Sequence, residues 1–196
     1  MNAGLTSLCV YCGSAVGRTP AYREAGERLG RLLAVHEVRL VFGGGRIGMM
    51  GVIADAVVRH GGKVTGIIPS FLEAREVGHR GIDDLRVVDS MHMRKQLMFE
   101  LSDAFAILPG GYGTLDETFE IITWRLLGMH DKPVVIVNQD DYWLPLIDLI
   151  EHCRREGFVS ERRDLFRVVA NVDEVLPALM EAAEAAPRQV SRPSRF

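Results

Sequence analysis

The chain has few cysteines and few lysines, and it has no long apolar run. Its cysteines are Cys9, Cys12 and Cys153, and the first two have the spacing of a CxxC pair. Cys9 and Cys12 lie at the end of a predicted strand, where residues three apart face opposite sides. Because Cys153 offers no second pair, we do not expect a redox or zinc-binding cysteine pair.

The lack of a long apolar run bears on location. No stretch approaches the ~18–20 apolar residues that cross a bilayer. Residues 1–7 lack the basic start and apolar core of a secretion signal. We therefore expect a cytoplasmic protein with no membrane partner.

Strong charge of either sign is also missing. The formal net charge is −3 and the pI is about 6.1, so no broad surface for nucleic acid is expected. His79 and His92 have no carboxylate or cysteine at metal-like spacing, so no metal site is predicted. An anionic ligand would have to be bound locally.

The length and composition are those of one well-packed domain. The chain has 196 residues, of which 47% are hydrophobic and 25% charged. Residues 1–185 are expected to form that domain. The tail at 186–196 mixes proline, serine and arginine, and we expect it to be disordered.

The most informative stretch runs from Leu108 to Glu117, with the sequence LPGGYGTLDE. It follows an apolar run at 104–108 that predicts a buried strand, and it precedes helical spacing at 119–127. Its three glycines, Gly110, Gly111 and Gly113, would let the backbone amides approach a ligand. With Thr114 expected at the helix N-cap and the positive dipole end behind it, a phosphate is favoured there.

The same residues have a purely structural interpretation. Thr114 and Glu117 also fit a capping box, in which the glutamate binds back to the N-cap amide. The glycines would then form only a tight turn. Both interpretations stay open at this point, although a turn seldom needs so many glycines after a buried strand.

Strands alternate with helices along the whole chain. This pattern predicts an α/β fold, a doubly wound parallel sheet in a single domain. Ligands bind such sheets at the carboxyl ends of the strands, where the loops at Gly13, Gly43, Ser70 and Gly110 would gather. The expected strands lie at 5–11, 38–42, 64–68, 104–108, 133–137 and 166–170, and the expected helices at 22–35, 51–60, 90–102, 119–127, 143–155 and 172–184.

A second glycine-rich loop contains a GxGxxG pattern at Gly43, Gly45 and Gly48. A dinucleotide site would place this motif after the first strand, with an acidic residue ending the next one. Here the next strand ends in Pro69, so a nicotinamide cofactor is not expected, and no other cofactor is predicted. Close approach of Gly45 to a smaller ligand, or to a neighbouring helix, explains these glycines better.

Three further features bear on a site. Ser14 follows the first strand and could contact a ligand, although it could equally cap the next helix or be solvated. The irregular, charged segment at 69–89 could form a flap over the site. Arg94 and Lys95 lie in the first turns of a predicted helix, where the dipole does not favour cations, which suggests an anion contact or an exposed basic turn.

Taken together, these motifs make the sequence similar to the "Lonely guy" family of phosphoribohydrolases, long misannotated as lysine decarboxylases. The resemblance covers nearly the whole chain and is most specific in two motifs, Met91–Lys95 and Pro109–Glu117. It implies a Rossmann-like fold, a homodimer, and catalysis by Arg94 and Glu117. It implies nucleotide contacts at Glu76, Lys95, Gly111, Tyr112, Gly113, Thr114 and Thr123, to which we add Gly110, Ser14 and Gly45 as candidate substrate-binding residues.

The resulting hypothesis is hydrolysis of the N-glycosidic bond of an adenine-type, or cytokinin, nucleoside 5′-monophosphate, with AMP itself a candidate. A carrier of a nucleotide or cofactor, without turnover, is the alternative, because the same fold and loop would suit it. Glycine loops that merely pack in an interaction protein are a third. A decarboxylase using pyridoxal phosphate would need a lysine for its aldimine, and of Lys63, Lys95 and Lys132 only Lys95 lies near the expected crevice.

Overall fold

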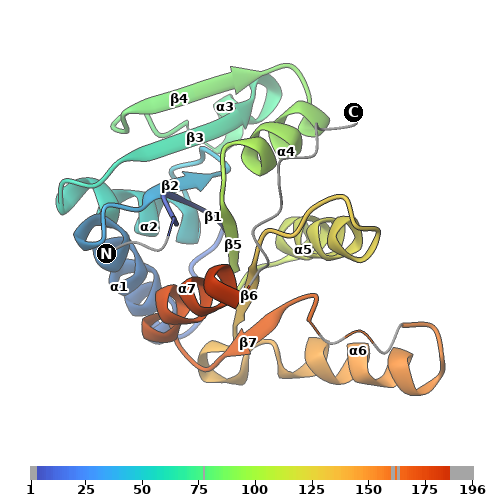
Figure 1. Ribbon diagram of the computed structural model, residues 1–196. Helices are drawn as coiled ribbons and strands as arrows, with labels where there is room; N and C mark the ends of the chain where they lie inside the picture. Colours follow the sequence, from blue (N-terminus) through green and yellow to red (C-terminus); the bar gives the residue numbers. More distant parts are fainter. Residues whose placement is uncertain (1–3, 77, 160–161, 163, 186–196) are drawn as a thin grey trace.

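The computed structural model describes residues 4–76, 78–159, 162 and 164–185. Seven strands form one parallel sheet in the order β4-β3-β2-β1-β5-β6-β7 (Figure 1). The predicted doubly wound parallel sheet is therefore confirmed.

Outside residues 69–89, the strands and helices alternate as the periodicity predicts. The strands are β1 (Ser7–Tyr11), β2 (Arg39–Phe42), β3 (Val64–Pro69), β4 (Asp84–Val88), β5 (Ala104–Ile107), β6 (Val134–Val137) and β7 (Arg167–Val169). The helices are α1 (Pro20–Val35), α2 (Gly48–Arg59), α3 (Ser70–Glu76), α4 (Met91–Glu100), α5 (Tyr112–Leu126), α6 (Leu144–Arg155) and α7 (Val175–Ala185), with short 3-10 turns η1 (Gln139–Asp141) and η2 (Val172–Glu174).

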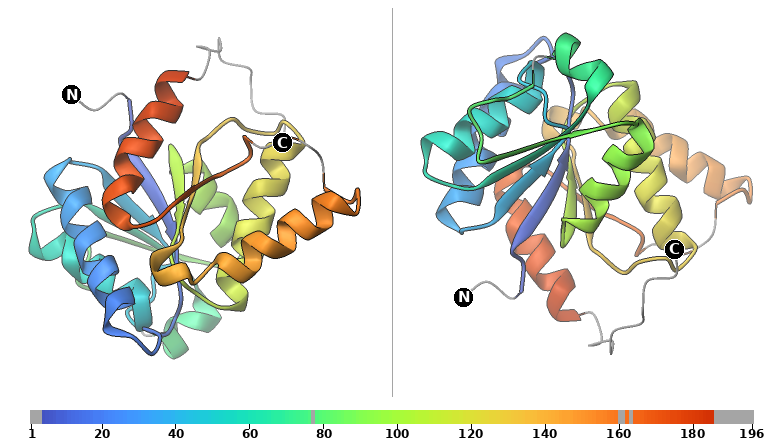
Figure 2. Two further views of the ribbon diagram at one scale, coloured as in Figure 1. Left: turned by 90° about the horizontal axis from the view of Figure 1, so that it is seen from below. Right: turned by 90° about the horizontal axis from the view of Figure 1, so that it is seen from above.

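Helices cover both faces of the sheet. Helices α1, α2 and α7 lie on one face, and α4, α5 and α6 lie on the other (Figures 1 and 2). Each strand therefore needs apolar side chains on both sides. In β5, Ala104 and Ala106 pack with the first group of helices, whereas Phe105 and Ile107 pack with the second. This two-residue alternation divides the core into two layers.

The order of the strands creates a crevice. The chain builds outward from β1 through β2 and β3 to β4, and then returns to place β5 on the other side of β1. At such a reversal the loops after the two central strands part, and ligands bind between them. The loop after β5 is the glycine-rich stretch at Pro109–Gly111.

Four expectations from the sequence need correction. The segment at 69–89, expected to be an irregular flap, contains helix α3 and the edge strand β4. The helix expected to follow an N-cap at Thr114, with apolar spacing at 119–127, already begins at Tyr112. The last expected helix is split into η2 and α7. Ser70 begins α3 and does not line the central cavity described below. The observed boundaries differ from the expected ones because tertiary packing and loop geometry decide where each element begins, and the hydrophobic periodicity carries no information on either.

Within the described ranges, no helix is both long and apolar enough to cross a membrane.

Candidate active site

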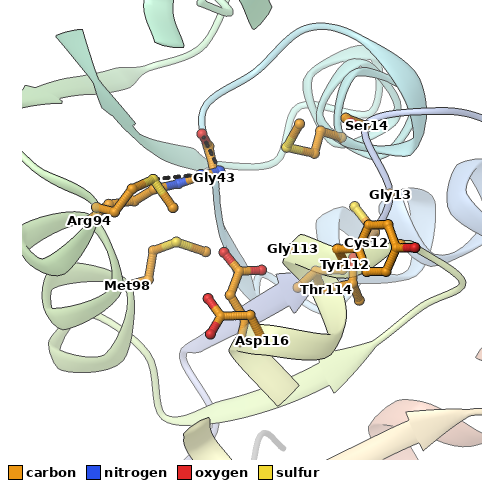
Figure 3. Close-up of a pocket in the computed structure, with 15 residues that line it drawn as sticks. Cys12, Gly13, Ser14, Gly43, Arg94, Met98, Tyr112, Gly113, Thr114 and Asp116 are labelled. Atoms are coloured by element: carbon orange, nitrogen blue, oxygen red, sulfur yellow. Dashed lines mark hydrogen bonds between the residues drawn. The ribbon is translucent and has the colours of Figure 1, made fainter. Parts of the chain in front are cut away.

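A cavity of about 140 Å³ lies at the reversal point between β1 and β5. Figure 3 shows its lining, with Arg94 and Met98 projecting from α4, Asp116 from α5, and Gly13 and Ser14 from the loop after β1. The full lining comprises Val10, Cys12, Gly13, Ser14, Gly43, Met50, Met91, Arg94, Met98, Gly111, Tyr112, Gly113, Thr114, Asp116 and Glu117.

Three glycine-rich loops meet at this cavity. The amide of Gly13 donates to the carbonyl of Pro109 at 3.1 Å, which joins the loops after β1 and β5. The amide of Met49 donates to the carbonyl of Gly13 at 3.0 Å, which adds the loop after β2. A Cβ on Gly48 would lie 2.1 Å from the carbonyl carbon of Ser14, so only glycine allows this approach. The predicted gathering of these three loops is confirmed.

Helix α5 points its amino end at the cavity. Its N-cap is Gly111 and its first bonded amide is that of Leu115, which donates to the carbonyl of Gly111 at 3.0 Å. The amides of the first helical turn, from Tyr112 to Thr114, are free of intrahelical partners, as in any helix, and the dipole adds positive potential. Backbone donors and potential together suit an anion.

The prediction that Thr114 is the N-cap was wrong. Thr114 lies inside the first turn, because the backbone turns into the helix at Gly111. A capping box between Thr114 and Glu117 is thereby excluded, since that motif requires the threonine at the cap. The hydroxyl of Thr114 is buried and has no hydrogen-bond partner in the described part of the chain. It is a polar group that a ligand in the cavity could satisfy.

Arg94 is a buried cation held by the second glycine loop. Ser90 caps α4 by accepting a hydrogen bond from the amide of Met93, and Arg94 follows in the first turn with only 6% of its surface exposed. Its Nη2 donates to the carbonyl of Gly43 at 3.0 Å (Figure 3). Its Nε has no partner among the described residues. A buried guanidinium with an unused donor is costly unless a ligand completes it.

Glu117 is the buried carboxylate of the cavity. It lies in the second turn of α5 and is 9% exposed. Burial raises the pKa of Glu117 from 4.5 to about 7, although the neighbouring Arg94 guanidinium works in the opposite direction. A carboxylate with a pKa near neutrality can exchange a proton at physiological pH, which is what general acid–base chemistry requires.

Lys95 links the two helices that flank the cavity. Its Nζ donates to Asp116 at 3.2 Å and to Glu120 at 3.0 Å, both on α5. Burial works to lower the pKa of Lys95, but the hydrogen bonds to Glu120 and Asp116 outweigh it and raise that pKa. Lys95 is therefore a fixed cation at the rim, beside the cavity rather than among its lining residues.

The other predicted site residues divide into two groups. Ser14 and the run from Gly111 to Thr114 line the cavity, and Gly110 lies directly beside them. Gly45 is buried and forms an isolated bridge with Gly78, outside the lining. Thr123 is exposed further along α5. Glu76 ends α3, and its side chain is outside the part of the structure that is described.

Sequence reasoning missed several lining residues, among them Cys12, Met50 and Asp116. Met91 and Met98, both on α4, line the cavity as well. A signal existed for these two, because residues seven apart share a helix face and Arg94 lies between them on that face. Met50 and Cys12 carried no such signal, since their place depends on how the first and second loops pack.

Comparison with known proteins identifies the family. A family model described as "Possible lysine decarboxylase" matches residues 50–179. The cytokinin riboside 5′-monophosphate phosphoribohydrolase of Rhodococcoides fascians is 48% identical over 155 residues, which are 79% of this chain and 78% of that protein. Its namesake LOG of Oryza sativa subsp. japonica is 42% identical over 180 residues, 92% of this chain and 74% of that one. The chain belongs to the Lonely guy family. The resemblance seen in the motifs is thus confirmed.

Solved structures support the fold of this Lonely guy protein. The Moco carrier protein from Chlamydomonas reinhardtii superposes with a TM-score of 0.70 at 18% identity, covering 93% of this chain and 99% of that one. The molybdenum cofactor binding protein from Rippkaea orientalis gives a TM-score of 0.67, also at 18% identity, covering 90% and 96%. At such identities the likeness concerns the fold alone.

The wording "lysine decarboxylase" finds no support in the lysines of this Lonely guy protein. Lys63 precedes β3 and Lys132 precedes β6, so both lie at the amino edge of the sheet, opposite the cavity. Lys95 is paired with two carboxylates, which hold it protonated. An aldimine needs a neutral, accessible amine, and none of the three lysines offers one at the cavity.

Proposed function

We propose that this protein hydrolyses the N-glycosidic bond of an adenine-type nucleoside 5′-monophosphate, of the cytokinin kind, to the free base and ribose 5-phosphate. One observation carries the proposal. Buried Arg94 and buried Glu117 line the same cavity as the amino end of α5. The names of relatives that are 42–48% identical describe the same reaction.

The 5′-phosphate would bind at the start of α5. The amides of Gly111, Tyr112 and Gly113 supply donors, the buried hydroxyl of Thr114 supplies another, and the helix dipole favours the charge. Fixing the phosphate there holds the ribose over the second turn of α5, which lowers the entropic cost of reaching the transition state.

Glu117 would carry the main chemical role. Breaking the bond between C1′ and the base nitrogen builds positive charge on the ribose, as in other glycosidic cleavages. The carboxylate of Glu117 stabilises that charge, and it accepts a proton from the water whose oxygen bonds to C1′. The base leaves with the bonding electron pair and takes up one proton from solvent, and Glu117 afterwards returns to solvent the proton that it accepted, so that one water is consumed in each cleavage.

Arg94 would act as a donor and a counter-charge. Arginine keeps its charge at any relevant pH, so it is unsuited to general acid catalysis. Its unpartnered Nε and its place on the cavity wall allow it to bind a ribose or base acceptor while it keeps Glu117 partly ionised. The two residues thus depend on each other electrostatically.

The remaining predicted contacts keep secondary roles in this proposal. Ser14 lies on the lining and would contact the nucleotide directly. Lys95 and Thr123 lie on the flanking helices and would act at the rim. Gly45 would shape the second loop, and Glu76 would approach from the end of α3. A cytoplasmic location stays a prediction of the sequence.

We also propose that the protein is a homodimer, as the family resemblance implies. Apolar side chains of α5 and the turn after it are exposed, among them Phe119, Leu126 and Leu127. Met93 on α4 is exposed as well. A second copy would cover these side chains, and light scattering after gel filtration should give twice the chain mass of 21.8 kDa. A monomer mass would contradict the dimer.

The experiment that tests the activity is chromatography of AMP and N6-isopentenyl-AMP after incubation with the wild type and with Glu117→Gln. Release of free base and ribose 5-phosphate by the wild type alone is the expected result, and the faster substrate identifies the preferred base. Binding of either nucleotide without cleavage by the wild type would replace the hydrolase with the carrier. Failure of both nucleotides to bind would leave neither function standing.

A further inference from the structure

The phosphate-binding loop is also contacted from outside the cavity. The hydroxyl of Tyr142 donates to the carbonyl oxygen of Gly110 at 2.6 Å, although the two residues are 32 positions apart. Tyr142 follows β6 and η1, and β6 lies next to β5 in the sheet (Figure 1). The loop after β6 therefore reaches across to the loop after β5.

The turn that presents Tyr142 is held firmly. Asp140 and Asp141 both have left-handed backbone angles, with φ of 51° and 58°, which is uncommon outside glycine. Asn138 stabilises this turn, because its Nδ2 donates to Asp141 Oδ1 at 3.1 Å and its Oδ1 accepts from the amide of Trp143 at 2.8 Å. Strained backbone of this kind persists where the surroundings fix it, and it often serves a site.

The ring of Tyr142 packs on the opposite wall of the loop from the catalytic cavity. It meets Tyr22 of α1 edge to face, with centroids 5.5 Å apart, and it meets Trp143 at 4.8 Å. Tyr22 and Tyr142 line a second cavity of about 290 Å³, which shares Gly13, Ser14 and Gly111 with the first cavity. The loops after β1 and β5 therefore lie between the two cavities.

The geometry of one peptide bond links the two sides. The carbonyl of Gly110 and the amide of Gly111 belong to the same planar trans peptide, so they point in opposite directions. When Tyr142 holds the carbonyl on its side, the amide of Gly111 is directed to the other side. The carbonyls before and after it, those of Pro109 and Gly111, are held by the amides of Gly13 and Leu115. A peptide between two glycines can still rotate between these anchors more freely than any other, and the hydrogen bond from Tyr142 opposes that rotation.

We propose that Tyr142 is a positioning residue, whose hydroxyl fixes the Gly110–Gly111 peptide so that the amide of Gly111 faces the phosphate of the substrate. The inference rests on the proposed function, because the phosphate is that of the nucleotide. Tyr142 does not touch the substrate. It acts through the loop, by preparing a donor before the ligand arrives.

The test compares Tyr142→Phe with the wild type and with Tyr22→Phe as a matched control. Both variants keep an aromatic ring in the same pair, but only Tyr142→Phe loses the hydrogen bond to Gly110. Titration calorimetry gives the Kd for ribose 5-phosphate and adenosine. Tyr142→Phe should weaken binding of ribose 5-phosphate about three- to tenfold, with adenosine unchanged, and with AMP as substrate it should raise KM more than it lowers kcat.

The outcomes are distinct. Equal affinities in Tyr142→Phe and the wild type would overturn the inference, as would equal weakening of adenosine, which indicates general damage. Equal loss in Tyr22→Phe, which keeps the hydrogen bond between Tyr142 and Gly110, would show that this bond is not the cause and would also overturn the inference. Because ribose 5-phosphate binding needs no turnover, a wild type that binds it without cleaving nucleotides would refute only the proposed function. A wild type that cleaves nucleotides, with Tyr142→Phe equal to it in affinity and in KM, would refute only the role given to Tyr142.

Discussion

Arg94 donates through Nη2 to the carbonyl oxygen of Gly43 at 3.0 Å, across 51 residues of sequence. This contact depends on the absence of a side chain at Gly43, because a Cβ there would lie 1.8 Å from Nη2 of Arg94. The glycine after β2 thus makes room for the guanidinium that α4 brings to the cavity. The glycine-rich loop after β2 is thus needed by the Met91–Lys95 motif on α4.

Gly43→Ala should therefore disable Arg94 although Arg94 itself is not mutated. The added methyl group would displace the guanidinium, and we expect kcat to fall about 100-fold, as when a preorganised donor is removed. Steady-state kinetics check this. In a double-mutant cycle, Gly43→Ala should add little to Arg94→Ala, because both remove the same interaction. Additive losses would show that Gly43 acts independently of Arg94.

The pH dependence of the reaction should report Glu117. If ionised Glu117 is the base, kcat/KM should rise with pH and level off above a midpoint near 7, the pKa of Glu117. The substrate phosphate titrates near pH 6 as well, so the assignment needs a variant. Arg94 lowers the pKa of Glu117, so Arg94→Met should move the midpoint upward. A midpoint unchanged in Arg94→Met would assign it to another group.

Glu117→Gln should lose activity and gain stability. The folded-state pKa is about 7 against 4.5 ordinarily, so the wild type loses stability as pH rises from about 4.5 to about 7. Above pH 7 the neutral glutamine should be more stable by about 3 kcal/mol, the equivalent of that shift. Urea denaturation at pH 4 and pH 8 checks this. A difference that stays the same at both pH values would contradict the titration of Glu117.

Asp103 should stabilise the start of the sheet. Its Oδ2 accepts from the amides and hydroxyls of Thr6 and Ser7, at 2.8–2.9 Å. Burial works to raise the pKa of Asp103, but these hydrogen bonds outweigh it and lower that pKa. Asp103→Ala should cost about 1–3 kcal/mol at neutral pH.

Titration of Asp103 should change the stability with pH in the opposite direction from titration of Glu117. A lowered folded-state pKa means that this stabilisation is present above pH ~4 and is lost as pH falls below it. Denaturation of the wild type and Asp103→Ala should thus converge between pH 4 and pH 2. Asp103→Glu is the control, because it keeps the carboxylate charge but places it one methylene group further from the backbone. A gap that widens towards acid would contradict the role given to the ionised carboxylate.

Much of the fold was readable from the sequence. Apolar strands that alternate with helices predicted the parallel sheet, because such strands must be covered on both faces, and all four residues of β5 are indeed buried. The glycines before α5 predicted a phosphate loop for a chemical reason, the need for backbone amides to approach a ligand. The mild conflict between Arg94 and the helix dipole pointed to the same cavity.

Local boundaries were less readable. Thr114 looked like an N-cap because cap preferences act within a few residues, whereas Gly111 became the cap through contacts between loops after β1 and β5. The segment at 69–89 looked irregular because its charges hide the edge strand β4, whose outer side is exposed. Hydrophobic periodicity and cap preferences are properties of short segments, so they do not include contacts between loops that are far apart in the sequence.

The sequence by itself therefore determined the alternation of strands and helices outside 69–89, the loops that hold glycine and the family to which the chain belongs. These follow from local chemistry, since periodicity and backbone freedom are properties of short segments. Only the tertiary structure decided that Gly43 makes room for Arg94, that burial raises the pKa of Glu117 to about 7, and that Tyr142 holds Gly110. Each depends on groups far apart in the chain, whose distance, desolvation and charge exist only once the sheet has formed.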